Sequence, residues 1–256
     1  MTKGAAAVTA AAEPRRPSQQ RSRLRFEMLL DAADALLGDK ETTEVGLYDI
    51  AGAAKVPPAS VYHLFPTKES AFVALAERYL IGLSNHITRP APSRQLRRWQ
   101  DFVALELHRA VEYYNDHKVM SKLFFGANVI RDVRILDVRN VEAASASTYG
   151  RMNELFEMPY LYDADTKFAV LIGIYDGIWM TSYARHGRIT ADFARESELA
   201  GLSYCETFLP AVIPLRAPQA LTGAGGGPNS ITIESTKTRS NSRRTSAGRK
   251  PSASER

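Results

Sequence analysis

Apolar residues recur at helical spacing through most of the chain. In the first repeat, Phe26, Leu29, Leu30, Ala33 and Leu37 fall on one face of a helix. Similar faces follow as far as residue 212, and no segment sustains the alternation of apolar and polar residues that marks a half-buried strand. The sequence therefore predicts an all-α fold of about nine helices.

Glycine, proline and capping residues set the boundaries of these helices. Gly38 is expected to end the first helix, and Pro159 follows the seventh. Thr67, Asp163 and Thr190 are expected to cap the helices that they precede. The predicted helices cover residues 22–37, 47–54, 59–64, 68–87, 94–117, 120–125, 130–157, 164–186 and 191–212.

Two of these helices are short and are joined by a tight turn. Residues 47–54 and 59–64 flank Val56-Pro57-Pro58, and a proline suits the first turn of a helix because its missing N–H would have no partner there. Such a helix-turn-helix unit places its second helix in the major groove of DNA, with the N-terminal residues leading. Short helices joined by tight turns also occur in all-α proteins that bind no nucleic acid, so the pattern alone leaves both readings open.

Several side chains in this stretch have the chemistry of a DNA contact. The phenol of Tyr62 and the ammonium of Lys68 suit backbone phosphates, and the helix N-terminus opened by Thr67 offers N–H groups to an anion. The remaining candidates are the leading residues of the second helix, with two residues at the ends of the supporting helix: Pro58, Ala59, Ser60, His63, Tyr48 and Lys55. Together these residues form the predicted DNA-binding site.

Residues 25–72 resemble the N-terminal domain of tetracycline-repressor-type (TetR-family) regulators. The matching pieces, in chain order, are LLDAA at 29–33, DIA at 49–51, AKV at 54–56, VY at 61–62, Phe65 and Lys68-Glu69. The resemblance implies a homodimer on a pseudo-palindromic operator, usually a repressor, that a small molecule releases. It also implies that Tyr62 and Lys68 contact phosphate, and that residues 58–60 and 63 face the groove.

The same stretch departs from the family pattern at two positions. Leu64 stands where the family often has histidine or another polar aromatic residue, and Gly46 stands where a serine or threonine cap is usual. The groove-facing side is also poor in arginine, asparagine and glutamine, which read guanine and adenine through paired hydrogen bonds. We therefore expect specificity to depend on methyl contacts, on Tyr48 or on the shape of the DNA.

Charge is distributed unevenly along the chain. The net charge is +5, yet residues 1–25 carry six basic residues against one acidic residue, and residues 215–256 carry eight against two. The segment between them is therefore acidic. Basic ends on a nucleic-acid binder can add phosphate contacts that weaken with salt, although such tails can also serve solubility alone.

These patterns divide the chain into four parts. Residues 1–20 are predicted to be a disordered basic arm, and residues 21–88 a helix-turn-helix DNA-binding domain with its connecting helix. Residues 89–213 are predicted to form a helical effector-binding and dimerisation domain. Residues 214–256, rich in glycine, serine, threonine and arginine, are predicted to be a disordered basic tail.

The helix predicted at residues 164–186 carries a stripe of small residues. Gly173, Gly177, Thr181 and Ala184 fall on one face, where another helix can approach closely. A neighbour in the same chain would use such a stripe equally well. Because regulators of this family pair their last two long helices with those of a second copy, we favour a homodimer interface here.

A second stripe on the same predicted helix is aromatic. Aromatic stripes are usually core, but as a set these residues can also line an apolar cavity for an effector with a few polar groups. Asp176 lies among apolar residues and therefore needs a partner. The predicted effector site comprises Trp99, Phe102, Phe125, Tyr149, Met152, Tyr175, Asp176, Trp179 and Tyr183.

No catalytic or metal-binding constellation stands out in the sequence. There is no glycine-rich phosphate loop, nucleophile elbow or HExxH motif, and one cysteine, Cys205, fits a reducing compartment. No run approaches the roughly 18 apolar residues of a membrane span, and the alanine-rich N-terminus lacks the apolar core of a secretory signal. We expect a cytoplasmic, non-enzymatic regulator without cofactor or metal; an enzyme on a helical scaffold and a helical adaptor that binds no DNA are the alternatives.

Overall fold

The computed structural model describes residues 13–17, 19–91 and 96–216. Over these ranges the chain forms helices and no strand, apart from one isolated antiparallel bridge between Phe156 and Leu215. The helices are α1 (Gln20–Asp39), α2 (Leu47–Ala53), α3 (Pro58–Leu64), α4 (Lys68–Ile87), α5 (Trp99–Asp116), α6 (Lys118–Phe125), α7 (Arg131–Leu155), α8 (Ala164–His186) and α9 (Ala191–Cys205). The predicted all-α class is confirmed.

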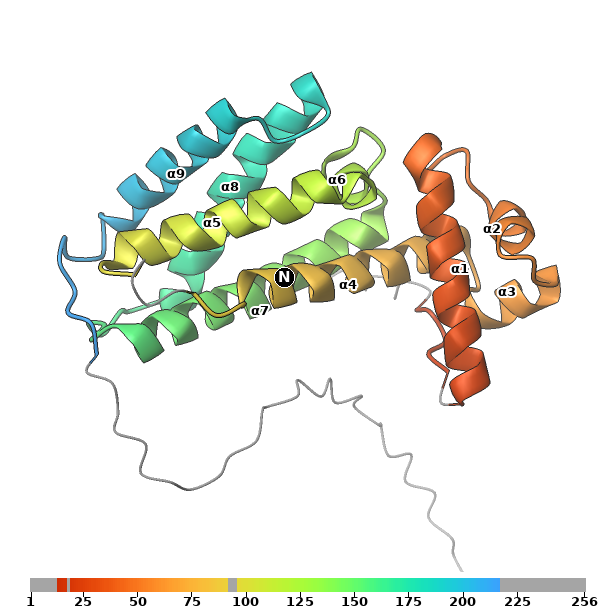
Figure 1. The fold of residues 1–256 in the computed structure, drawn as a ribbon, viewed down its shortest axis with the longest axis horizontal. Coiled ribbons are helices and arrows are strands. Elements are labelled where there is room, and N and C mark those ends of the chain that lie inside the picture. Colours follow the sequence, from red (N-terminus) through yellow and green to blue (C-terminus); the bar gives the residue numbers. More distant parts are fainter. Residues whose placement is uncertain (1–12, 18, 92–95, 217–256) are drawn as a thin grey trace, which may run out of the picture. The chain divides into compact units, whose positions relative to one another are not determined.

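The first three helices and the start of α4 share one core, which we call the head. α1 packs on α2 and α4, and α2 packs on α3 (Figure 1). The ring of Phe65, directly after α3, lies 4.9 Å from that of Phe26 on α1, and Phe65 and Phe72 are fully buried. The apolar face predicted for the first helix therefore closes onto the two short helices.

The helices that follow form a second group, which we call the body. α4 leads out of the head and packs on α5 and α7, while α8 packs between α7 and α9 (Figure 1). Trp99, Phe124, Phe156 and Phe168 are fully buried in this group. No helix among the described residues combines the length and the apolar character that a membrane crossing requires.

One lysine of the body holds the end of a head helix. The ammonium of Lys122, on α6, donates to the carbonyls of Leu37 at 2.7 Å and Lys40 at 2.9 Å, at the C-terminus of α1. These carbonyls have no partner within the helix, and the helix dipole favours a cation beside them. The hydroxyl of Thr42 also donates to the carbonyl of Asn128, at 3.3 Å. Head and body are thus joined at α1 and α6 as well as through α4.

Two of the three predicted caps are confirmed. Thr67 accepts the N–H of Ser70 at 3.2 Å, and Thr190 accepts the N–H of Phe193 at 3.5 Å. The prediction for Asp163 is wrong: its backbone is left-handed, with φ 61°, and its side chain makes no capping bond. Its carboxylate is thereby turned out of the capping position.

Two predicted helix ends also need correction. α1 continues through Gly38 to Asp39 and ends because Lys40 is extended. The last helix ends at Cys205, not at residue 212. Its final turn is tightened by bonds from the N–H groups of Thr207 and Phe208 to carbonyls three residues back, and Pro210 follows, which cannot donate an N–H to a helix.

Parts of both segments that were predicted to be disordered are described, and they contact the helices. The N–H of Arg15 donates to the carbonyl of Leu64 at 2.9 Å. At the other end, the N–H of Arg216 donates to the carbonyl of Leu155 at 2.8 Å. The predictions of disorder for residues 1–12 and 217–256 lie outside the described residues.

Candidate functional site

The turn between α2 and α3 is closed by a strained residue. Lys55 has φ 54°, in the left-handed region that favours glycine. This conformation lets the N–H of Val56 reach back to the carbonyl of Ala51 at 3.0 Å, which ends α2 as a glycine normally would. Pro58 then opens α3 at its first position. The angle between the two helices is therefore fixed by the backbone.

α3 has one buried side and one exposed side. Val61 and Leu64 are buried in the head, whereas Tyr62 and His63 face solvent. Val61 therefore anchors the helix in the core beside an outward Tyr62. Leu64, with 4% of its surface exposed, is a core residue in this chain and offers no polar group in place of the usual histidine.

The exposed side carries a pair of tyrosines. The rings of Tyr48, at the start of α2, and Tyr62, on α3, meet edge to face with centroids 5.9 Å apart. They remain 68% and 44% exposed, respectively. Edge-to-face packing holds two large side chains in place without burying their hydroxyls. Two predicted DNA-binding residues are thus brought together and presented to solvent.

The predicted anion site at the start of α4 is more occupied than the sequence suggested. The ammonium of Lys68 donates to the carbonyls of Thr42 and Thr43, at 3.3 and 3.5 Å. The hydroxyl of Thr67 already satisfies the N–H of Ser70. A phosphate here would meet the first two N–H groups of α4 and share Lys68 with the preceding loop.

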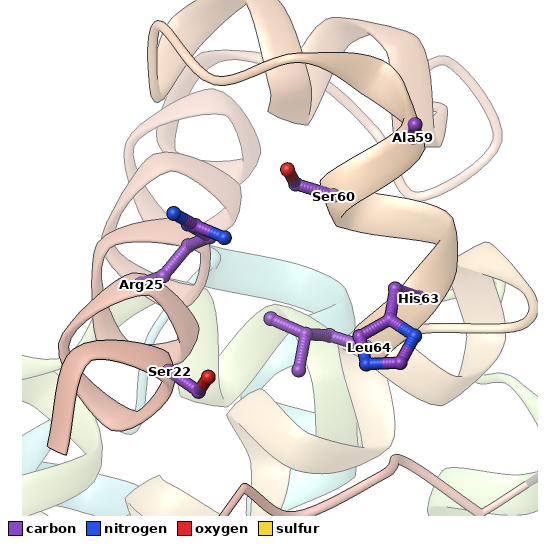
Figure 2. Close-up of a pocket in the computed structure, with 6 residues that line it drawn as sticks. All are labelled: Ser22, Arg25, Ala59, Ser60, His63 and Leu64. Atoms are coloured by element: carbon purple, nitrogen blue, oxygen red, sulfur yellow. The ribbon is translucent and has the colours of Figure 1, made fainter. Parts of the chain in front are cut away.

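A notch separates α1 from α3. It has a volume of about 240 Å³ and is lined by Ser22, Arg25, Ala59, Ser60, His63 and Leu64 (Figure 2). The sequence predicted Ala59, Ser60 and His63 of α3 as DNA-binding residues but did not single out Ser22 and Arg25. Their signal was available: they precede the buried Phe26 and Leu29 by four residues each, and so flank the buried face of α1.

In the body, the aromatic residues of α8 join a larger cluster. The ring of Trp179 stacks on Tyr175 at 5.7 Å and lies 5.6 Å from Tyr114 of α5. Phe125 of α6 lies 4.8 Å from Tyr114 and 6.4 Å from Tyr183. Four of the predicted effector-site residues are therefore neighbours, connected through Tyr114, which the prediction omitted.

The other predicted aromatic residues lie elsewhere in the core. The indole N–H of Trp99 donates to the carbonyl of Pro210 at 3.0 Å, so Trp99 holds the chain after α9 onto α5. Tyr149 packs on Phe168, and Met152 is fully buried. Phe102 packs under a charged group, with the guanidinium of Arg151 5.8 Å from its ring.

An ion pair lies beside that ring, with 13% of the Glu106 side chain and 20% of the Arg151 side chain exposed. Glu106 of α5 pairs with Arg151 of α7 and accepts the hydroxyl of Thr148 at 3.0 Å. Burial raises the pKa of Glu106 to about 7, against the opposing effect of Arg151. Sequence reasoning missed this pair, although Glu106 interrupts the apolar face formed by residues 99, 103 and 107.

Four polar atoms near this region are buried without a hydrogen-bond partner among the described residues. They are Nε and Nη1 of Arg151, the hydroxyl of Tyr175 and the indole nitrogen of Trp179. A Cβ at Gly201 of α9 would lie 2.3 Å from the Tyr175 hydroxyl, so the phenol needs that glycine. All four atoms can donate, and buried donors are normally paired.

Asp176 lies on α8 beside a second carboxylate. Burial, and then the nearby charge of Asp137, raises the pKa of Asp176 to about 7. Arg134 is the cation in this cluster, but it bonds Asp137 at 2.9 Å. The partner that the sequence led us to expect for Asp176 is therefore not found among the described residues: its charged neighbours are the carboxylate of Asp137, which raises its pKa, and the guanidinium of Arg134, which lowers it.

The small-residue stripe of α8 faces solvent. Gly173, Gly177 and Ala184 are exposed, and a Cβ added at either glycine would meet no atom within 4 Å. Val170 and Met180 are also exposed, at 42% and 47%, along the same face. Within the described residues, no helix of the same chain covers this stripe.

Comparison with known proteins gives a family match in the head. Residues 29–75 match the family described as bacterial regulatory proteins, tetR family. No match was found among curated protein sequences.

Solved structures match over most of the chain. A TetR-family transcriptional regulator from Streptomyces coelicolor has a TM-score of 0.52 and 20% identity, covering 73% of this chain and 98% of its own. A TetR regulator from Rhodococcus sp. RHA1 has 0.52 and 23%, covering 73% and 97%. SmeT, the repressor of the Stenotrophomonas maltophilia multidrug efflux pump SmeDEF, has 0.53 and 17%, covering 73% and 91%, and its triclosan complex also matches, at 0.52 and 18%, covering 78% and 100%.

At these identities the structural matches establish the fold, and the family match establishes the type of head. Residues 29–75 are a tetR-family regulatory domain, and the described chain has the fold of TetR-family transcriptional regulators.

Proposed function

We propose that this protein is a homodimeric repressor that binds a pseudo-palindromic operator and is released by a small hydrophobic or aromatic effector. The observation that carries the proposal is the exposed side of α3, which presents Tyr62 and His63 while Val61 and Leu64 anchor it. A helix fixed in this way can enter a major groove with its N-terminal residues leading. SmeT, which shares the fold, is a repressor.

The stripe on α8 supports the homodimer. Gly173 and Gly177 leave the backbone open on a face that also exposes Val170 and Met180. Apolar surface beside open glycines suits the close approach of a second helix. A second copy of α8, related by a two-fold axis, would cover this face with the same residues from both chains.

The interior of the body supports an effector with a hydrogen-bond acceptor. The hydroxyl of Tyr175, the indole N–H of Trp179 and two guanidinium nitrogens of Arg151 are all buried without partners in the described chain. An unpaired buried donor costs about 1–3 kcal/mol, which an acceptor would recover. The proposed effector is therefore an aromatic or apolar molecule that carries a phenol, carbonyl or carboxylate. Triclosan, bound in one SmeT structure, is a compound to test first.

α6 offers a route from this interior to the head. On one side, Phe125 packs on Tyr114 and Tyr183 of the aromatic cluster. On another, Lys122 bonds the last carbonyls of α1. An effector that displaces the aromatic rings would therefore move a helix that holds the head in place.

Regulation would follow from thermodynamic linkage between effector binding and DNA binding. Two heads must be about one helical turn of DNA apart, roughly 34 Å, to occupy successive major grooves. If the effector favours a different spacing, it must weaken DNA binding, and DNA must weaken effector binding by the same factor.

The test uses the full chain and a duplex that the protein itself selects from a randomised library. Tyr62→Ala removes one phosphate contact per head; at about 1.5–3 kcal/mol for each charged hydrogen bond, two copies should weaken binding by two orders of magnitude or more. Tyr160→Ala is the matched control, because Tyr160 is 90% exposed on the body. Equal affinity of Tyr62→Ala and wild type would show that α3 does not contact the DNA.

The effector is tested on the same complex. Triclosan should raise the melting temperature of the free protein and lower its affinity for the selected duplex. A compound that binds the body but leaves the affinity for DNA unchanged would remove effector release from the proposal and leave DNA binding in place.

A further inference from the structure

The notch between α1 and α3 has opposed polar walls. Arg25 and Ser22 project from α1, and Ser60 and His63 lie on α3 across from them (Figure 2). Leu64, which is buried, forms part of the floor. The volume of about 240 Å³ is several times the roughly 30 Å³ that one water takes up in the liquid, so a group larger than water fits.

The charge of α1 is sorted between its two flanks. On the flank toward α4, Glu27, Asp31 and Asp34 lie 3.5, 2.6 and 3.9 Å from the guanidinium of Arg78. On the flank toward α3, none of the residues that line the notch is acidic. Among the described residues, no carboxylate lies within 4 Å of the Arg25 guanidinium. The notch therefore combines an uncompensated positive charge with hydroxyl and imidazole groups.

The position of the notch suits the backbone of the DNA rather than its bases. Ala59 and Ser60 belong to the leading half of α3, and they line the notch together with His63 of its last turn. The major groove is about 12 Å wide and a helix with its side chains about 10–12 Å across, so α3 would fill the groove. A side chain that reaches α3 from a neighbouring helix then lies at the groove edge, where the phosphates are.

We propose that the notch between α1 and α3 seats one backbone phosphate of the operator, with Arg25 as its principal ligand and Ser22, Ser60 and His63 as further donors. This inference rests on the proposed function, because it requires α3 to enter the major groove. The phosphate contact is independent of sequence, and it fixes the depth and angle of α3.

The phosphate contact would add binding energy that the N-terminal residues of α3 do not provide. Pro58, Ala59 and Ser60 offer few hydrogen bonds to base edges, so a head held only by α3 would bind weakly. Arg25 in the notch and Tyr62 on α3 would then contact two different phosphates. Two separate contacts to the DNA backbone would hold α3 in the groove. Arginine suits the role because its planar guanidinium can donate two parallel hydrogen bonds to one phosphate.

The experiment compares Arg25→Ala with Arg23→Ala in the full chain. Arg23 carries the same charge on the same helix, but its guanidinium is turned away to the carbonyl of Pro17, at 3.3 Å. Affinity is measured over a series of salt concentrations on two duplexes, the one selected by the protein and one of unrelated sequence. Melting temperatures confirm that both variants fold.

Arg25→Ala should weaken binding to both duplexes by about tenfold or more, and Arg23→Ala by much less. The slope of log affinity against log salt should fall in magnitude by about 0.9 for each lost phosphate contact, or about 1.8 for two heads. Arg25→Lys should restore part of the affinity and most of the slope. Ser22→Glu, which places a carboxylate in the notch, should weaken binding at least as much as Arg25→Ala.

Three results separate the possible outcomes. If Arg25→Ala and Arg23→Ala lose affinity and slope equally, the notch holds no phosphate and the inference is overturned. If Arg25→Ala loses affinity only on the selected duplex, Arg25 reads a base, which also overturns it. If wild type binds neither duplex, the proposed function fails instead, and with it the premise of the inference.

Discussion

The head and the body treat their polar groups differently. In the head, the starts of two helices are closed by nearby side chains: Thr67 and Ser70 exchange bonds at the start of α4, and Asp49 accepts the N–H of Gly46 at the start of α2. In the body, the Glu106–Arg151 pair is largely removed from solvent, and the hydroxyl of Tyr175 and two guanidinium nitrogens of Arg151 are buried without a partner in the described chain.

This difference matches the two tasks of the proposed function, DNA binding by the head and effector binding by the body. A head that must present α3 at one angle benefits from satisfied caps, because each cap contributes about 1 kcal/mol and fixes where a helix begins. A body that must respond to a ligand benefits from groups that gain a partner only when the ligand arrives. The unpaired donors thus lower the stability of the free body and are available for binding.

The largest effect is expected from separating the two copies of the proposed homodimer. Gly177→Arg places a long charged side chain on the exposed stripe of α8, where a Cβ meets no atom within 4 Å, so the monomer should fold normally. Loss of the second head removes the gain from two linked sites, and DNA affinity should fall by about 10²–10⁴-fold. Sedimentation and duplex binding measure the two effects.

Gly150→Arg is the control for that variant, because Gly150 on α7 is also exposed with open space around it. It should leave both the assembly state and the affinity unchanged. A monomeric Gly177→Arg protein that binds the selected duplex as tightly as wild type would mean that one head suffices. If the Gly177→Arg protein remained dimeric, the dimer interface would have to lie on a surface other than this stripe of α8.

The head was more predictable from sequence than the body, for a physical reason. Its helices are set by local signals: the prolines at 57 and 58, the cap at Thr67 and the apolar spacing of α1. The strain at Lys55 was not predictable, because nothing in the residue type indicates a left-handed backbone. The notch was also missed, because it depends on how closely α1 and α3 approach.

In the body, sequence reasoning found helices but not their polar interior. Pairing of Glu106 with Arg151 joins residues 45 positions apart on different helices, and no local pattern encodes it. The aromatic stripe of α8 was visible, yet its connection through Tyr114 depends on tertiary packing. Trp99 was predicted to line the effector site, but its indole N–H bonds the segment after α9. Its position in α5 does not reveal this contact, because it depends on tertiary packing.

A second prediction tests the polar interior through pH. Burial and the charge of Asp137 raise the pKa of Asp176 from an ordinary 3.8 to about 7, so the folded state holds this proton more tightly than the unfolded state does. Stability therefore falls as pH rises from about 4 to 7, and the loss is complete above pH 7. Asp176→Asn, which cannot ionise, should be more stable than wild type at pH 8, by about 2 kcal/mol after allowance for partial exposure.

Urea unfolding of wild type and Asp176→Asn at pH 4.5 and pH 8 measures this. The two should be nearly equal at the lower pH and differ at the higher one. Glu106 has the same raised pKa, yet Glu106→Gln should destabilise the protein at pH 8, because Arg151 would lose its buried partner. Parallel pH profiles for wild type and Asp176→Asn would show that Asp176 ionises as freely in the folded protein as in the unfolded chain.

The smallest expected effect lies in the head, at the one strained residue of its turn. Lys55→Gly relieves the left-handed backbone at φ 54°, which costs a residue with a Cβ about 1–2 kcal/mol, although glycine loses more entropy on folding. The net gain in stability should be about 0.5–1 kcal/mol, measured by urea unfolding. If Lys55 contacts DNA, as predicted, the same variant should bind the selected duplex more weakly. Lys55→Asn also tolerates the left-handed region and carries no charge, but it lacks the backbone flexibility of glycine, so it should share the loss of affinity if the missing charge is the cause. Undiminished binding by both variants would show that the Lys55 ammonium has no role in DNA binding, and the backbone contacts of the head would then rest on Tyr62, Lys68 and the notch.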